Sequence, residues 1–136
     1  MTTVNVSATR TAPKDAFLRF ALRLDAVVSG IVGVGGLALA PRIAEMSGTA
    51  SAFEYSLAAF FVAYGIAVYG LSRMAHVRTI GIVIALGNAV FTVAAVAAVV
   101  AGIWPLTTFG IVLTLACGVF TLVMADLQYL GVRRMS

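Results

Sequence analysis

Long apolar stretches, separated by short polar or basic segments, make up most of the chain. Residues 1–16 are polar and show no hydrophobic period, which predicts a flexible N-terminal tail. Each apolar stretch after it is close to the roughly 20 residues that a helix needs to cross a bilayer. We expect a transmembrane domain over 17–131 and a basic C-terminal tail over 132–136. Its helices are expected at residues 17–40, 52–72, 79–103 and 108–130.

Local signals suggest where the first two helices end and begin. Pro41 follows the first apolar stretch, and we expect the helix to stop there because proline cannot continue the hydrogen-bond ladder. Ser51 and Glu54 have the spacing of a capping box, in which the two side chains satisfy backbone amides at a helix start. This spacing predicts that the second helix begins at Ala52 and gives Glu54 a structural role.

Similar signals bound the other two helices. Trp104 and Pro105 follow the third apolar stretch, and tryptophan favours the membrane interface. Thr107 or Thr108 can cap the fourth helix, and Gly131 is typical of a helix end. We therefore expect the fourth helix to stop at about Leu130.

Composition identifies the solvent. The chain is 62% hydrophobic and 10% charged, whereas a soluble domain carries roughly 25% charged residues, so we predict an integral membrane protein. Abundant Ala, Val, Gly and Arg are typical of a GC-rich bacterial genome. One cysteine and one histidine exclude disulfide scaffolds and paired-histidine sites, and no metal or cofactor is expected.

Charge indicates topology rather than nucleic-acid binding. The formal net charge is +4, and basic residues of membrane proteins collect on the cytoplasmic side. The connector at 73–78 is so short that the helices it joins must be antiparallel. We therefore predict an all-α, antiparallel four-helix bundle in a bacterial inner membrane, with both termini cytoplasmic. The expected cytoplasmic side then holds Arg10, Lys14, Arg19, Arg23, Arg73, Arg78, Arg133 and Arg134, and the outer side holds Arg42.

Asp25 is the first candidate for intramembrane chemistry. It shares a small, polar helix face with Ser29, which lets another helix approach closely. One interpretation buries Asp25 against a neighbouring helix, paired with an arginine of the 73–78 connector or reaching the cytoplasmic interface. The other makes it a proton- or cation-coupled carboxylate in a central cavity. The full stripe is Asp25, Ser29, Gly33, Gly36 and Ala40.

Polar residues also occur inside the third and fourth helices. Asn88 lies near the middle of the third, where an amide must hydrogen-bond to a neighbouring helix. Thr114 and Thr121 belong to one face of the fourth, interpreted first as a packing face and second as a ligand-lining face. That face comprises Thr107, Gly110, Thr114, Thr121, Ala125 and Gln128.

Asp126 lies off this face, near the end of the fourth helix. We expect a structural ion pair with Arg133, or with Arg23 or Arg78 from another helix. A joint site of Asp25 and Asp126 is an alternative, and it would need a cation or raised pKa values for the two carboxylates to coexist.

Several short motifs resemble a group of uncharacterised small four-helix integral membrane proteins of actinobacteria and other GC-rich bacteria. They are Arg23-Leu24-Asp25-Ala26 before a glycine-rich span, Asn88, Leu106-Thr107-Thr108-Phe109-Gly110 and Asp126-Leu127-Gln128. The resemblance covers about residues 20–130. It implies a fold and a membrane location, and no activity.

Two functional hypotheses follow. The first is a non-enzymatic accessory or scaffolding protein that binds membrane lipid or partner helices, as a homo-oligomer or a subunit of a larger membrane complex. The stripes of the first and fourth helices would be its contact faces. The alternative is a small transporter or ligand carrier that uses Asp25, Asn88 and Asp126. No pair of nucleophile and base can be named, so an enzyme is not expected.

Overall fold

A computed structural model describes residues 13–136, and these residues form helices and no strand. This confirms the prediction of an all-α protein with four helices. Each helix is long and apolar enough to cross a membrane. Most of the predicted N-terminal tail, including Arg10, lies outside the described residues. The helices are α1 (Ala16–Ser47), α2 (Ser51–Leu71), α3 (Val77–Ala101) and α4 (Thr108–Arg134).

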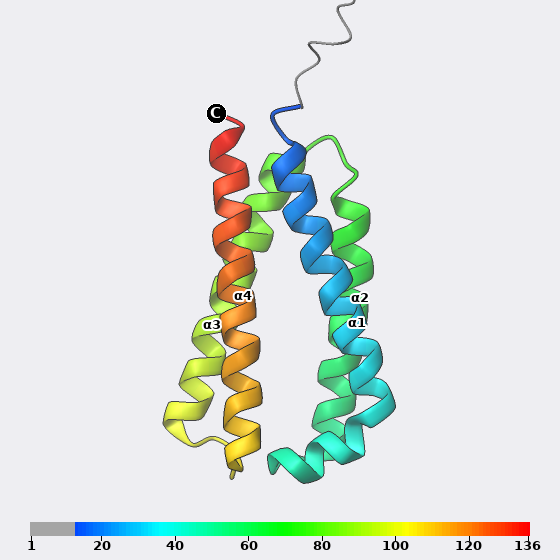
Figure 1. Cartoon of the computed structure of the whole chain (residues 1–136), viewed down its shortest axis with the longest axis vertical. Coiled ribbons are helices and arrows are strands. Elements are labelled where there is room, and N and C mark those ends of the chain that lie inside the picture. Colours follow the sequence, from blue (N-terminus) through cyan, green and yellow to red (C-terminus); the bar gives the residue numbers. More distant parts are fainter. Residues whose placement is uncertain (1–12) are drawn as a thin grey trace, which may run out of the picture.

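Helix α1 continues through Pro41, so the predicted end at Ala40 is wrong. Proline removes one hydrogen bond from a helix and bends it, but the residues beyond it can stay helical. Figure 1 shows the bend, after which the last turns of α1 run towards the start of α4. The helix ends at Gly48, whose φ of 81° is the left-handed conformation that favours glycine. The segment 41–50, which lies between the first two predicted helices, is therefore mostly helix.

Helix α4 also continues past its predicted end, because Gly131 does not stop it. A Cβ atom at Gly131 would lie 2.7 Å from Cα of Leu18 on α1. The glycine thus serves a close helix crossing. At the other end of α4 the prediction is confirmed, since Thr107 is the cap and its hydroxyl accepts from the Gly110 amide at 3.1 Å.

The predicted capping box at the start of α2 is wrong. Helix α2 begins at Ser51, so this serine lies inside the helix, and Ala50 takes the capping position without a side-chain hydrogen bond. The Glu54 carboxylate accepts instead from the Thr49 hydroxyl at 2.6 Å. Helix α3 ends at Gly102, with φ 64°, two residues before Trp104.

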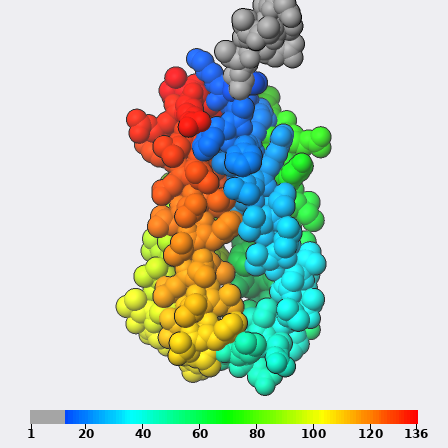
Figure 2. All heavy atoms as spheres, viewed as in Figure 1, coloured from blue at the N-terminus to red at the C-terminus, as the bar shows by residue number. Residues whose placement is uncertain are grey.

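The helices associate as two pairs, α1 with α2 and α3 with α4 (Figure 1). The pairs meet mainly where α1 contacts α4. A buried apolar cluster holds them together at the end where the described chain starts and finishes. Its members are Leu18, Leu22, Ala26, Val68, Val77 and Val132. Figure 2 shows that the surface between α1 and α4 is hollowed further from this end.

Small residues bring α1 and α2 close together. A Cβ atom at Gly33 would lie 2.7 Å from the backbone nitrogen of Val62, and one at Gly65 would lie 2.6 Å from the Ala26 carbonyl oxygen. The prediction that the α1 stripe admits another helix is confirmed, and that helix is α2 of the same chain. The stripe is therefore covered by α2. The expectation that it forms an exposed face for oligomer contacts is wrong.

We predict that Gly33→Ala destabilises the protein, because the new methyl group would have to enter the α2 backbone. Overpacking of this kind costs about 1–3 kcal/mol, and it should lower the thermal unfolding temperature of the protein in detergent, followed by circular dichroism. Gly35→Ala is the matched control, since nothing lies within 4 Å of a Cβ atom at that position. Equal unfolding temperatures for the two variants would contradict the close contact.

Candidate functional site

The carboxylate of Asp25 receives hydrogen bonds from side chains of all four helices. Asp25 has no exposed surface. Its Oδ2 accepts from the Tyr64 hydroxyl on α2 at 2.7 Å, from Nδ2 of Asn88 on α3 at 2.8 Å and from Nε2 of Gln128 on α4 at 2.8 Å. Its Oδ1 accepts from the Ser29 hydroxyl, one turn along α1, at 3.2 Å. We call these five residues the Asp25 hub.

The hub is complementary to an ionised carboxylate, which only accepts hydrogen bonds, because every partner donates. All of the donors are neutral, so the predicted pairing of Asp25 with an arginine of the 73–78 connector is wrong. Two arginines of α1, Arg19 and Arg23, bind instead at Ser72, the residue directly before that connector. Arg19 donates to the Ser72 carbonyl at 2.6 Å, and Arg23 donates to the Ser72 hydroxyl at 3.2 Å.

Asn88 links α3 to α4 as well as to α1. Its Nδ2 also donates to Oε1 of Gln128 at 3.0 Å, so the amides of Asn88 and Gln128 support each other against the same carboxylate. The prediction that Asn88 hydrogen-bonds to neighbouring helices is confirmed. Gln128 was predicted only as part of a polar face of α4. The helical spacing placed it on the face of Thr121, but nothing in that spacing assigned its partner.

A second polar contact joins α3 and α4 beside the hub. The hydroxyls of Thr92 and Thr121 lie 2.7 Å apart, so one can donate to the other, and each lies 3.0 Å from the Gly118 carbonyl oxygen. Thr114 lies further along α4, where its hydroxyl donates at 2.7 Å to the carbonyl of Gly110 in the preceding turn. The α4 face is therefore a packing face near the hub, and its residues Thr114 and Thr121 also line cavities.

Asp126 does not belong to this site. It is exposed, and it is not among the hydrogen-bond partners of the buried Asp25, so the structure does not bring the two carboxylates together in one site. The expected ion pair with Arg133 is also wrong, because Arg19 with Asp15, at 2.9 Å, is the only ion pair within residues 13–136. The Arg133 guanidinium lies instead over the ring of Tyr129, 5.8 Å from its centre.

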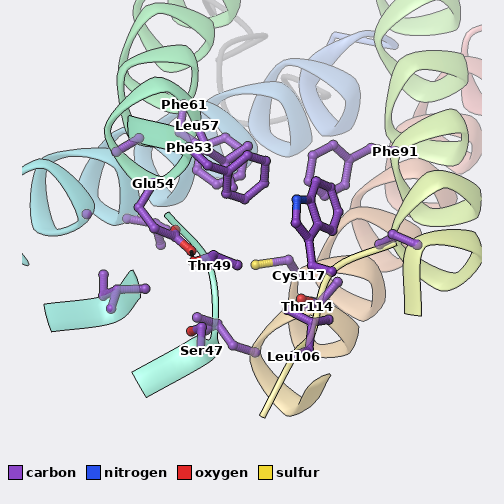
Figure 3. Close-up of a pocket in the computed structure, with 18 of the residues that line it drawn as sticks. Ser47, Thr49, Phe53, Glu54, Leu57, Phe61, Phe91, Leu106, Thr114 and Cys117 are labelled. Carbon is purple, nitrogen blue, oxygen red and sulfur yellow. Dashed lines mark hydrogen bonds between the residues drawn. The ribbon is translucent and has the colours of Figure 1, made fainter. Parts of the chain in front are cut away.

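Two adjoining cavities lie between the helix pairs, on the far side of the hub from the chain ends. The larger has a volume of about 390 Å³ and the smaller about 360 Å³. Both are lined mainly by apolar side chains, several of them aromatic. Figure 3 shows the larger cavity, with Phe53 and Phe61 from α2 facing Phe91 from α3. The residues that line both are Val32, Phe61, Phe91, Leu113 and Cys117.

The hub and the cavities are connected. Ser29, Tyr64 and Asn88 of the hub also line the smaller cavity. At the opposite end, the larger cavity is bounded by Ser47 and by the Thr49–Glu54 pair. The site is thus an apolar space with a satisfied polar group at one end and a second polar group at the other.

The described residues contain no cluster of side chains suited to binding a metal ion. Among residues 13–136, no three His, Cys, Asp or Glu side chains gather closely enough to hold a metal ion.

Comparisons with protein families, with curated proteins and with solved structures found no match for this chain. The resemblance to small four-helix proteins of GC-rich bacteria therefore stays a prediction.

We predict that Asp25→Ala strongly destabilises the protein. It would leave the donors of Tyr64, Asn88 and Gln128 without their shared acceptor, and unsatisfied buried donors cost about 1–3 kcal/mol each. Denaturation in mixed detergent micelles should give a free energy of unfolding lower by about 3 kcal/mol or more.

Asp126→Ala is the matched control for Asp25→Ala, since it removes the same charged group from an exposed position of α4. We expect a change within about 0.5 kcal/mol, as at most surface sites. A comparable loss in the two variants would contradict the hub.

Proposed function

We propose that the chain spans a bacterial inner membrane as an antiparallel four-helix bundle with both termini cytoplasmic. The length and hydropathy of the four helices support a membrane location. The positive-inside rule supports the orientation, because Arg19, Arg73 and Arg134 belong to the end that would face the cytoplasm, while Arg42 belongs to the other.

Within that membrane, we propose a non-enzymatic accessory protein that binds a lipid-like molecule between its two helix pairs. The observation that carries this proposal is the pair of adjoining apolar cavities of about 390 and 360 Å³. Ligand sites commonly measure about 300–1,000 Å³ and carry few polar groups. Apolar cavities do not hold water, so a hydrocarbon chain from the bilayer is the natural occupant.

The Asp25 hub explains how such a space persists. Its hydrogen bonds fix one helix pair against the other at one end, so the pairs cannot collapse onto each other along their whole length. The stripes of small and polar residues on α1 and α4 pack against other helices of the same chain. A homo-oligomer or a larger membrane complex would therefore use outward faces such as the one carrying Val90 and Val93, both more than 60% exposed.

We predict that Cys117→Phe displaces the bound molecule, because Cys117 lines both cavities and a benzyl group would fill the space where they meet. The protein is extracted from native membranes in mild detergent and examined by native mass spectrometry. The wild type should retain a lipid-like adduct, and the variant should retain roughly tenfold less, equivalent to about 1.4 kcal/mol of binding.

Val119→Phe provides the control for added bulk. Val119 is also on α4, is 61% exposed and lines neither cavity. It should keep the adduct of the wild type. A wild-type protein free of any adduct, or equal loss from Cys117→Phe and Val119→Phe, would overturn lipid binding between the pairs.

A proton-coupled carrier is a second candidate, favoured by one observation: Asn88 and Tyr64 bind Asp25 and also line the smaller cavity. Asp126, being exposed, plays no part in it. The carrier predicts that the wild type moves protons into pyranine-loaded vesicles and that Asp25→Asn, which keeps the side-chain shape, stops this movement. Proton flux at the level of empty vesicles for the wild type would exclude a carrier that moves protons on its own and would leave the binding protein.

A further inference from the structure

The end of the larger cavity far from the hub carries a half-buried carboxylate. Glu54 lies on the first turn of α2, where the Thr49 hydroxyl donates to its Oε1 at 2.6 Å. Figure 3 shows Glu54 and Thr49 side by side at the edge of the space. Of the described residues that line this cavity, Glu54 alone is charged. The cavity therefore has a negatively charged end, and none of its described lining residues is positively charged.

Ser47, at the end of α1, lines the same cavity and has an unsatisfied hydroxyl. The residue is 2% exposed, and its Oγ has no hydrogen-bond partner among the described residues. A helical serine commonly donates to the carbonyl of the preceding turn, so a buried hydroxyl without this bond is unusual. A hydroxyl can both donate and accept, so the Ser47 oxygen can accept a hydrogen bond from a ligand donor and its O–H can donate to an acceptor.

Two neighbouring aromatic rings also line this cavity. Phe53 and Trp104 both line the cavity, and their ring centres lie 4.9 Å apart. Aromatic faces attract cations, and the attraction is greatest where water is excluded. The nearby exposed charges, Arg42 and Glu45, do not line the cavity. The carboxylate and the aromatic rings favour a cationic ligand, and the Ser47 oxygen can accept one of its hydrogen bonds.

We propose that the cavity binds a cationic amphiphile, a protonated amine attached to a hydrocarbon tail. The ammonium group donates hydrogen bonds to the Glu54 carboxylate and to Oγ of Ser47, while the tail extends towards Phe61 and Phe91. This inference rests on the proposed function, because it names the class of molecule that the space between the helix pairs accepts.

The test compares ligands that share one tail. The full chain is reconstituted in phosphatidylcholine vesicles and titrated with dodecylamine, which is protonated at neutral pH, or with dodecanol, which is not. Trp104 is the only tryptophan in the chain and lines the cavity, so its fluorescence reports occupancy. We expect dodecylammonium to bind at least tenfold more tightly than dodecanol, with midpoints expressed per mole of lipid.

Two variants separate a specific site from a charged surface. Glu54→Gln keeps an acceptor for Thr49 and removes the charge, so it should weaken dodecylammonium binding at least tenfold and leave dodecanol unchanged. Glu45→Gln removes an exposed charge two residues before Ser47. It should change neither binding midpoint by more than twofold. Ser47→Ala should weaken dodecylammonium binding to a smaller extent than Glu54→Gln.

The outcomes distinguish this inference from the proposed function. Equal binding of dodecylammonium and dodecanol by the wild type, or equal loss in Glu54→Gln and Glu45→Gln, would overturn the cationic ligand while leaving an apolar one. No saturable response of Trp104 to either compound, together with no retained lipid in native mass spectrometry, would overturn both.

Discussion

The rest of the structure depends on one buried carboxylate. An acid in a membrane-spanning helix is costly unless its oxygens are satisfied, and lipid offers no donors. Asp25 obtains donors from its own helix and from each of the other three. Each of these helices must therefore present one polar side chain at the same depth and with the right rotation. This requirement fixes the four helices relative to one another more strictly than apolar packing, which tolerates sliding.

The hub also explains why the interior is hollow. Within each helix pair, glycine and threonine allow close contact, as at Gly33 and at the Thr92–Thr121 pair. Between the pairs, the hub acts at one end. The bent end of α1 acts at the other, where the Thr107 amide donates to the Ser47 carbonyl at 3.0 Å. The pairs are thus connected at two places, and the cavities lie in the interval between these connections.

The sequence predicts the number and position of the helices because the length of an apolar stretch is a direct consequence of bilayer thickness. It predicts their ends poorly, since Pro41 and Gly131 are typical of helix ends but here serve a bend and a close crossing. The candidate site was likewise predicted only in part from the sequence. Asp25 and Asn88 stand out as polar residues in apolar helices, whereas their contact depends on how the helices rotate against each other. Helical periodicity describes the faces of one helix and carries no information about that rotation.

The two polar ends of the interior differ in a way that assigns them different roles. At the hub, every oxygen of Asp25 has a donor, so a ligand that bound there would have to replace hydrogen bonds that already exist. At the other end, Glu54 has a single donor in Thr49, and the buried hydroxyl of Ser47 has no partner. A polar ligand gains most where the protein has left its own groups unsatisfied. In the proposed function, the selection of a ligand therefore belongs to the Glu54 end, and Asp25, the carboxylate that is more conspicuous in the sequence, belongs to the frame that connects the helix pairs.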